Sequence, residues 1–121
     1  MSRTPDEIIS SLNKAYAELY HGIKALEGLA IRQAETERDY EVGFAQEVLK
    51  LKSNGQPTTL IPKLAAGNKA IAELKFDYNV ATEMYKIQKA KISSCETAVN
   101  KIQSELGFVK VEYQKASLQE G

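Results

Sequence analysis

Cysteine, proline, glycine and net charge are all scarce in this sequence, and each shortage excludes a class of protein. The single cysteine, Cys95, cannot form an intrachain disulfide, which fits a reducing cytosol. Three prolines and seven glycines in 121 residues are too few for a loop-rich or collagen-like chain. Sixteen basic and sixteen acidic residues cancel, whereas a protein that wraps duplex DNA needs an excess of Lys and Arg. The length fits one domain, residues 1–121.

Long hydrophobic runs are also missing. No stretch approaches the ~20 apolar residues that a membrane-spanning helix requires. The N-terminal segment has no continuous apolar stretch after Arg3, so we do not expect a secretory signal. These absences predict a protein without a membrane partner, located in the cytoplasm, or in the host-cell cytoplasm if the chain is viral. A virion location is the alternative.

Catalytic and metal-binding motifs are absent as well. The sequence has no Gly-rich phosphate loop, nucleophile elbow or Cys-x-x-Cys pair. The only histidine, His21, follows Glu18 by three residues, but di-metal helical bundles need such a pair from each of two helices. Cys95 lies between Ile92 and Val99, where it behaves as a small hydrophobic residue. We therefore expect no enzyme, no cofactor and no metal.

The patterns that are present begin with a helix start. Thr4 can cap a helix, and Glu7 can reach back to the cap amide. Pro5 suits the first helical position, where its missing N–H costs nothing. Asp6 and Glu7 suit the positive end of the helix dipole. The sequence therefore predicts a helix that starts at about residue 5.

The first predicted helix carries an apolar seam at intervals of three and four residues. Its first members are Ile9, Leu12, Tyr16, Leu19, Ile23, Leu26 and Ala30. The seam weakens at Gln33 and Glu37, then resumes with Tyr40, Phe44, Val48 and Leu51. We predict one helix over about 5–52, and a break near Gly28 is the main alternative.

One segment, SNGQPTT at residues 53–59, reads as a connector. Its turn-forming residues are Asn54, Gly55 and Pro57. Thr58 or Thr59 can cap the next helix, and Pro62 is tolerated only in the first turn of that helix. The second helix is expected over about 60–116.

This second helix carries a longer and more regular seam. Seam residues recur about every 3.5 positions, which predicts left-handed supercoiling against a partner helix. The seam consists of Ile71, Leu74, Tyr78, Ala81, Tyr85, Gln88, Ile92, Cys95, Val99, Ile102, Leu106, Val109, Tyr113 and Ala116. We therefore expect an all-α protein, folded as a long antiparallel helical hairpin with coiled-coil-like packing.

Apolar residues outside the seam of the second helix need a further cover. They are Phe76, Val80, Met84, Ile87, Phe108 and Val111. If the first helix breaks near Gly28, a three-helix bundle could cover them. Alternatively, two hairpins associate into a four-helix arrangement, a homodimer, which is the solution we favour. The plainest alternative is that they are isolated exposed apolar residues.

Gln88 is the one polar residue in an otherwise apolar stretch of the second seam. A buried amide in a coiled coil often fixes the register or the choice of partner at a cost in stability. We therefore predict that Gln88 is a register residue.

An acidic run in the first helix is a candidate docking patch for a basic partner. It consists of Glu35, Glu37, Asp39 and Glu41, and Arg38 interrupts it. Residues two apart on a helix splay around its axis and do not converge on one ligand. A solvated face is therefore the favoured interpretation.

A basic set in the second helix is a candidate patch for a protein partner or a nucleic acid. It consists of Lys86, Lys89, Lys91 and Lys101, with Lys75 farther away. Basic residues between aromatic ones can hold single-stranded nucleic acid by charge and stacking. The nearby aromatic residues, Tyr78 and Tyr85, occupy seam positions, so we interpret them as core and do not favour nucleic-acid binding.

Three features between Arg32 and Tyr113 carry a resemblance to a known class. They are a long helix, the Gly-containing connector SNGQPTT, and a second helix rich in Ala, Lys and Tyr that ends in KISSCETAVNKIQSELGFVKVEY. This stretch resembles a loose class of small helical accessory proteins from the early regions of tailed bacteriophages. The resemblance implies a non-enzymatic protein that binds another protein, for instance an inhibitor of a host nuclease or defence complex. It assigns no role to an individual residue.

These observations lead to one favoured function and two alternatives. The favoured function is a phage-type interaction module that self-associates and occludes the surface of a host protein. The first alternative is an accessory factor in phage DNA recombination or replication, with the lysine set on single-stranded nucleic acid. The second alternative is a structural or virion component. The sequence does not identify the target.

Overall fold

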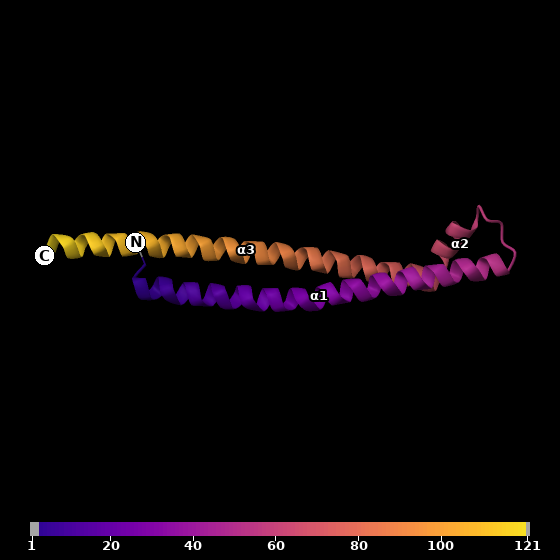
Figure 1. Ribbon diagram of the computed structural model, residues 1–121, viewed down its shortest axis with the longest axis horizontal. Coiled ribbons are helices and arrows are strands. Elements are labelled where there is room, and N and C mark those ends of the chain that lie inside the picture. The colour runs from indigo at the N-terminus through magenta and orange to yellow at the C-terminus, as the bar shows by residue number, and fades with distance from the viewer. Residues whose placement is uncertain (1–2, 121) are drawn as a thin grey trace. The chain divides into compact units, whose positions relative to one another are not determined.

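The computed structural model describes residues 3–120, with side chains as far as residue 118, and consists of three α-helices (Figure 1). They are α1 (Pro5–Ser53), α2 (Ile61–Gly67) and α3 (Lys69–Glu120). No strand occurs within the described residues. The all-α prediction is confirmed. Residues 1, 2 and 121 of the predicted single domain lie outside the described part, and the single domain itself stays a prediction.

Helix α1 starts where its capping signal predicts. The Thr4 Oγ1 accepts a hydrogen bond from the Glu7 amide at 3.3 Å, which satisfies one of the free amides of the first turn. The helix then runs through Gly28 without interruption. The alternative with a break near Gly28, and with it the three-helix bundle, is therefore not the arrangement that forms.

Helix α1 ends in a Schellman motif built by Gly55. This glycine has φ +77, a left-handed conformation that has little steric cost without a side chain. The Gln56 amide donates to the Leu51 carbonyl at 3.1 Å, and the Gly55 amide donates to the Lys52 carbonyl at 3.0 Å. These two bonds are the pair that closes such a helix end. The predicted turn at Asn54 and Gly55 is thus confirmed, and α1 ends within one residue of its predicted end.

The second helix is not continuous over 60–116, and this prediction was wrong. Leu60 precedes α2 with no side-chain cap, so neither threonine of the connector caps it. The chain then breaks at Asn68, whose Oδ1 accepts hydrogen bonds from the Ala70 amide at 2.9 Å and the Ile71 amide at 3.3 Å. Asn68 therefore caps α3. Helix α3 continues past the predicted end to Glu120.

The tertiary contacts divide the chain into two compact units, Met1–Ala25 with Gln88–Gly121, and Leu26–Ile87. In the first unit, Tyr16 of α1 contacts Gln103 of α3 through a hydrogen bond from Gln103 Nε2.

Farther along α1 in this first unit, Gly22 lies against Gln88 and Ile92. The α3 residue number falls as the α1 number rises, so the two helices are antiparallel here.

The second unit has the same pairing. Gln33 of α1 donates a hydrogen bond to Thr82 of α3 at 3.2 Å. Gly43 of α1 faces Leu74 and Ile71 of α3. The packing of α1 against α3 as an antiparallel helical hairpin is therefore confirmed. Association of two hairpins into a four-helix arrangement stays a prediction.

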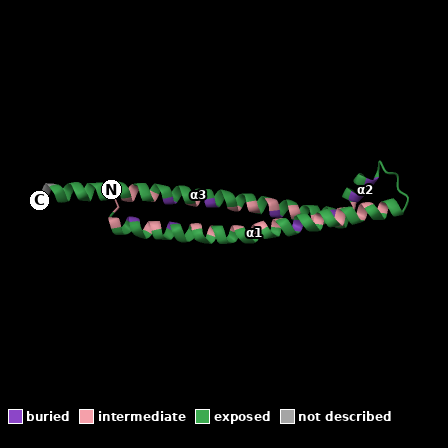
Figure 2. Ribbon diagram, in the orientation of Figure 1, coloured by how far each residue is buried: buried purple, intermediate pink, exposed green. Residues whose placement is uncertain are grey.

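The predicted seam of α3 is confirmed over most of its length. Every seam position from Ile71 to Val109 is buried or half-buried (Figure 2). The last two predicted positions, Tyr113 and Ala116, are exposed. The heptad pattern therefore gives the correct phase for this helix.

The predicted seam of α1 is partly wrong. Ile8 has no exposed surface and Ala15 is buried, whereas Ile9, Tyr16 and Ile23 are exposed, Ile9 to 44%. The buried and half-buried residues that continue the correct spacing are Ile8, Leu12, Ala15, Leu19, Gly22, Leu26, Leu29, Gln33, Thr36, Tyr40, Gly43 and Glu47.

Small residues explain the error in the α1 seam. Ala15, Gly22 and Gly43 occupy seam positions and leave room for larger α3 side chains, while a search for large apolar residues selects their neighbours one position later. Glu37 is likewise exposed, and Thr36 is the buried residue in its place. The Thr36 hydroxyl donates to the Arg32 and Gln33 carbonyls, so its burial leaves no unsatisfied polar group.

Candidate functional site

The candidate sites of this protein lie on exposed helix faces. The described residues enclose no pocket. They also contain no group of three or more His, Cys, Asp or Glu side chains placed to hold a metal ion. What the structure offers a ligand is therefore surface chemistry along α1 and α3.

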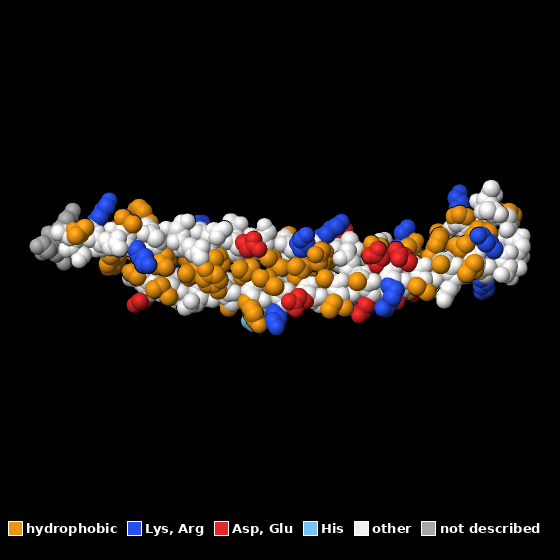
Figure 3. Space-filling model, viewed as in Figure 1, with side chains coloured by type: hydrophobic (Ala, Val, Ile, Leu, Met, Phe, Trp, Pro, Cys, Tyr) orange, Lys and Arg blue, Asp and Glu red, His pale blue; other side chains and the backbone are white. Residues whose placement is uncertain are grey.

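The clearest apolar surface in the second unit runs along α3, and we name it the α3 row. It consists of Phe76, Val80, Met84 and Ile87, which are 39% to 66% exposed. Their spacings of four, four and three residues place them on one face of the helix. Figure 3 shows that hydrophobic side chains are exposed on both long helices and are not confined to the seam.

Carboxylates border the α3 row. At about 100° per residue, Glu73 lies at the start of the row, and Asp77 and Glu83 lie along its two sides. All three are exposed. Lys86 Nζ lies 3.5 Å from the Glu83 carboxylate, so one border charge is partly compensated, although an exposed pair of this kind is weak. The row is thus an apolar strip with an acidic border.

The predicted register residue lies on the seam. Gln88 is half-buried, and its Nε2 donates a hydrogen bond to the Gly22 carbonyl at 3.0 Å. The contact from Gln33 to Thr82 is a second polar link between α1 and α3. Sequence reasoning placed Gln33 on the seam but missed Thr82, which follows the seam residue Ala81. That Gln88 selects the register stays a prediction.

The acidic run does not form one patch. Glu35, Glu37, Asp39 and Glu41 are all exposed on α1. Glu35 and Asp39, four residues apart, share one side of the helix, while Glu37 and Glu41 share another. Arg38 Nη2 pairs with the Asp39 carboxylate at 3.1 Å. A solvated face remains the better interpretation of these residues.

The lysine set does not form one patch either. Lys89 and Lys91 are two residues apart in α3, so they lie on nearly opposite sides of it. Lys86 and Lys101 are also exposed on α3, and Lys101 lies farther along the helix.

The two tyrosines near the lysine set, Tyr78 and Tyr85, are half-buried at seam positions, as predicted. The stacking surface that a single-strand site needs is therefore missing at these residues.

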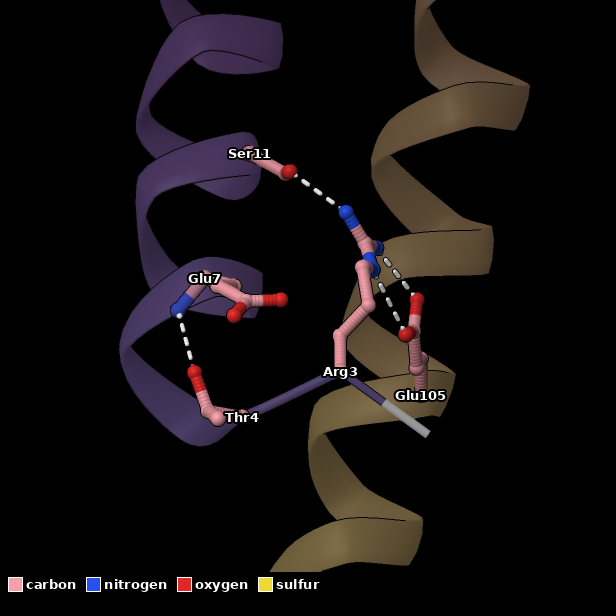
Figure 4. Close-up of polar contacts among 5 residues, drawn as sticks. All are labelled: Arg3, Thr4, Glu7, Ser11 and Glu105. Carbon is pink, nitrogen blue, oxygen red and sulfur yellow. Dashed lines mark hydrogen bonds and ion pairs between the residues drawn. The ribbon is translucent and has the colours of Figure 1, made fainter. Parts of the chain in front are cut away.

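An ion pair that the sequence did not predict joins Arg3 to α3 (Figure 4). Arg3 Nε donates to Glu105 Oε1 at 2.9 Å, and Nη2 donates to Oε2 at 2.5 Å. The remaining guanidinium nitrogen, Nη1, donates to the Ser11 hydroxyl at 2.6 Å. These hydrogen bonds hold the pKa of Glu105 below its ordinary value and raise the pKa of Arg3. Nothing in the local sequence marks the pair, because it depends on which residues of α1 and α3 meet.

The two other residues considered for chemistry are His21 and Cys95. His21 is exposed, and its ring centroid lies 5.6 Å from that of Tyr20 in an edge-on arrangement. Lys24 Nζ lies 5.5 Å from the centre of the same Tyr20 ring. Cys95 is a free thiol, half-buried at a seam position.

No helix among residues 3–120 combines the length and the apolar content that crossing a bilayer requires. Comparisons of the chain with protein-family models, with curated proteins and with solved structures found no match.

Proposed function

We propose that the protein is a non-enzymatic protein-binding module whose contact surface is the α3 row. The supporting observation is the exposure of four large apolar side chains, Phe76, Val80, Met84 and Ile87, on one face of a helix. Exposed apolar strips with a polar border are typical of protein interaction sites. The acidic border selects a partner segment that carries apolar and basic side chains together.

The α3 row cannot supply the whole binding energy. Covering a half-exposed Val, Ile, Met or Phe contributes about 1 kcal/mol, so four contribute roughly 4 kcal/mol. Association costs at least about 4 kcal/mol. The partner must therefore also engage the bordering carboxylates Glu73, Asp77 and Glu83, or further exposed parts of α1.

Occlusion is the mode of action that suits such a surface. A protein that covers part of another protein's surface needs contact area and orientation but no reacting group. In the setting implied by the phage resemblance, the partner is a host protein such as a nuclease or a defence complex. That setting stays a prediction, as does a location in the cytoplasm.

Capture from a bacterial lysate with quantitative mass spectrometry tests the proposal. Met84→Glu places a charge in the α3 row, and Asn79→Glu places the same charge on a neighbouring exposed face as the control. We expect the wild type and Asn79→Glu to retain one protein that Met84→Glu loses. Identical captured sets for all three would contradict the proposal. A single-strand-binding protein or a capsid protein among the specific captures would favour the two alternative functions.

A further inference from the structure

A second apolar row lies in the first unit, on α1, and we name it the α1 row. It consists of Ile9, Tyr16, Tyr20 and Ile23, which are 43% to 57% exposed. The spacings of seven, four and three residues place them on one face, with the exposed Asn13 between the first two. Three members of the row, Ile9, Tyr16 and Ile23, are residues that the sequence pattern assigns to the α1 seam but that the structure leaves exposed beside it. Aromatic residues in such a row are typical of the centre of an interface.

The two ends of the α1 row carry opposite charges. Asp6 lies three residues before Ile9, and Lys24 follows Ile23 directly. Because 18 residues make five helical turns, Asp6 and Lys24 lie on the same side of α1. They are about 27 Å apart along the axis, too far to pair with each other within one chain. Asp6 has no ion-pair partner among the described residues, and Lys24 lies over Tyr20.

We propose that the α1 row binds a second copy of this chain in an antiparallel, two-fold symmetric arrangement. A two-fold axis near the middle of the row, between Asn13 and Tyr16, makes the same surface contact itself. It brings Asp6 of each copy opposite Lys24 of the other. It also brings Ile9 of each copy against Tyr20 of the other. At the centre, Asn13 of each copy faces Tyr16 of the other.

Charge determines the orientation of this dimer. In a parallel arrangement Asp6 would face Asp6 and Lys24 would face Lys24, and like charges across an interface are unfavourable. The antiparallel arrangement replaces those two repulsions with two attractions. Exposed ion pairs contribute little affinity each, so the apolar row supplies most of the association and the charges select its geometry. This interface is separate from the α3 row and does not depend on the function proposed for it.

Charge reversal tests the arrangement in the full-length chain, by analytical ultracentrifugation in reducing buffer of low ionic strength. Asp6→Lys and Lys24→Asp should each raise the dimer Kd at least about tenfold, because two attractions become two repulsions. The double variant Asp6→Lys/Lys24→Asp should restore the Kd to within about threefold of wild type. Restoration is diagnostic, since these residues can meet only between two copies.

Two variants serve as matched controls. Glu7→Lys removes the other acid from the first turn, and Lys14→Asp reverses another exposed lysine, but neither side chain lies along the α1 row. Circular dichroism of each variant checks that it remains helical. We expect both controls to dimerise like the wild type.

Three results would overturn the proposal. The first is a wild type that stays monomeric up to about 300 µM, the range in which weak dimers form. The second is an equal loss of dimer in Glu7→Lys and Asp6→Lys. The third is a double variant no better than either single charge reversal. Tyr20→Ser, which shortens the row without changing charge, should also weaken the dimer, and an unchanged dimer there would contradict the apolar contribution.

Discussion

The Gln88 side chain of α3 reaches the backbone of α1 and donates a hydrogen bond to the carbonyl oxygen of Gly22 at 3.0 Å. The position that a Cβ would take on Gly22 lies 3.5 Å from the Gln88 Nε2 and 3.4 Å from Ile92, so both α3 side chains lie directly beside this glycine. An apolar seam tolerates a shift of one heptad, but this hydrogen bond requires one particular pairing. The polar residue and the glycine opposite it therefore form one register contact.

Gln88→Leu should widen the distribution of registers while changing stability little. A hydrogen bond contributes about 1 kcal/mol net, and added apolar burial offsets a loss of that size. Spin labels at the exposed residues Lys14 and Lys101, in a Cys95→Ser background, report the pairing of α1 with α3. We expect one narrow distance distribution for the parent and a broad or split one for Gln88→Leu. Equally narrow distributions would show that Gln88 does not select the register.

Two glycine substitutions should have different effects on stability. A Cβ at Gly28 would meet nothing within 4 Å, so Gly28→Ala should raise the unfolding free energy by about 1 kcal/mol through helix propensity. A Cβ at Gly43 would lie 2.7 Å from Leu74 Cδ1, the end of a flexible side chain, so Leu74 must move and this displacement offsets part of the same gain. Urea unfolding should therefore find Gly43→Ala less stable than Gly28→Ala. Equal gains would mean that Gly43 has no role in close packing.

The pair formed by Arg3 and Glu105 should make the free energy of unfolding depend on pH in the acidic range. The pKa of Glu105 is lowered in the folded state, chiefly by its hydrogen bonds with Arg3. The pair therefore contributes fully to the free energy of unfolding when the pH is above the Glu105 pKa in the unfolded chain, about 4.3. This contribution is lost as the pH falls through the lower pKa of the folded state. The urea midpoint should fall less between pH 7 and pH 2 in Glu105→Gln than in the wild type. Parallel pH curves for both proteins would rule out this contribution.

Asn68→Ala should destabilise the start of α3. The substitution removes the acceptor of two amide hydrogen bonds, and the loss of an N-cap costs about 1 kcal/mol. Asn79→Ala, at an exposed position inside the helix, is the control and should not destabilise. Faster hydrogen exchange at Ala70 and Ile71 would locate the effect at the cap. Unchanged exchange there, with unchanged stability, would mean that α3 begins without help from Asn68.

The sequence predicts α3 well because its seam residues are large and apolar while most of their neighbours are polar. It predicts α1 less well because Ile8 and Ile9 are both apolar, and the residues that follow on the true seam, Ala15 and Gly22, are small. A pattern based on hydrophobicity instead selects the larger apolar residues one position later, Tyr16 and Ile23. Only the packing against α3 shows that the small residues lie inside.

The candidate surfaces were predictable to different degrees. The residues of the α3 row were identified as uncovered, because their spacing places them away from the seam. The Arg3–Glu105 pair was not predictable, since it depends on the alignment of residues 102 positions apart in the sequence. The break at Asn68 was missed although Gly67-Asn68 is a common helix-ending pair, because the apolar spacing continues across it.

Site-specific photo-crosslinking at Val80 tests the binding role of the α3 row most directly. A benzophenone amino acid is placed at Val80 in the row, or at the adjacent Asn79 on another face, and each protein is irradiated in a bacterial lysate. We predict a covalent adduct with one particular protein from position 80 and none from position 79. Equal adducts from both positions, or none from position 80, would contradict the account. An adduct from position 80 only with a second copy of the chain would contradict binding to another protein and would favour the homodimer in which a second hairpin covers these residues.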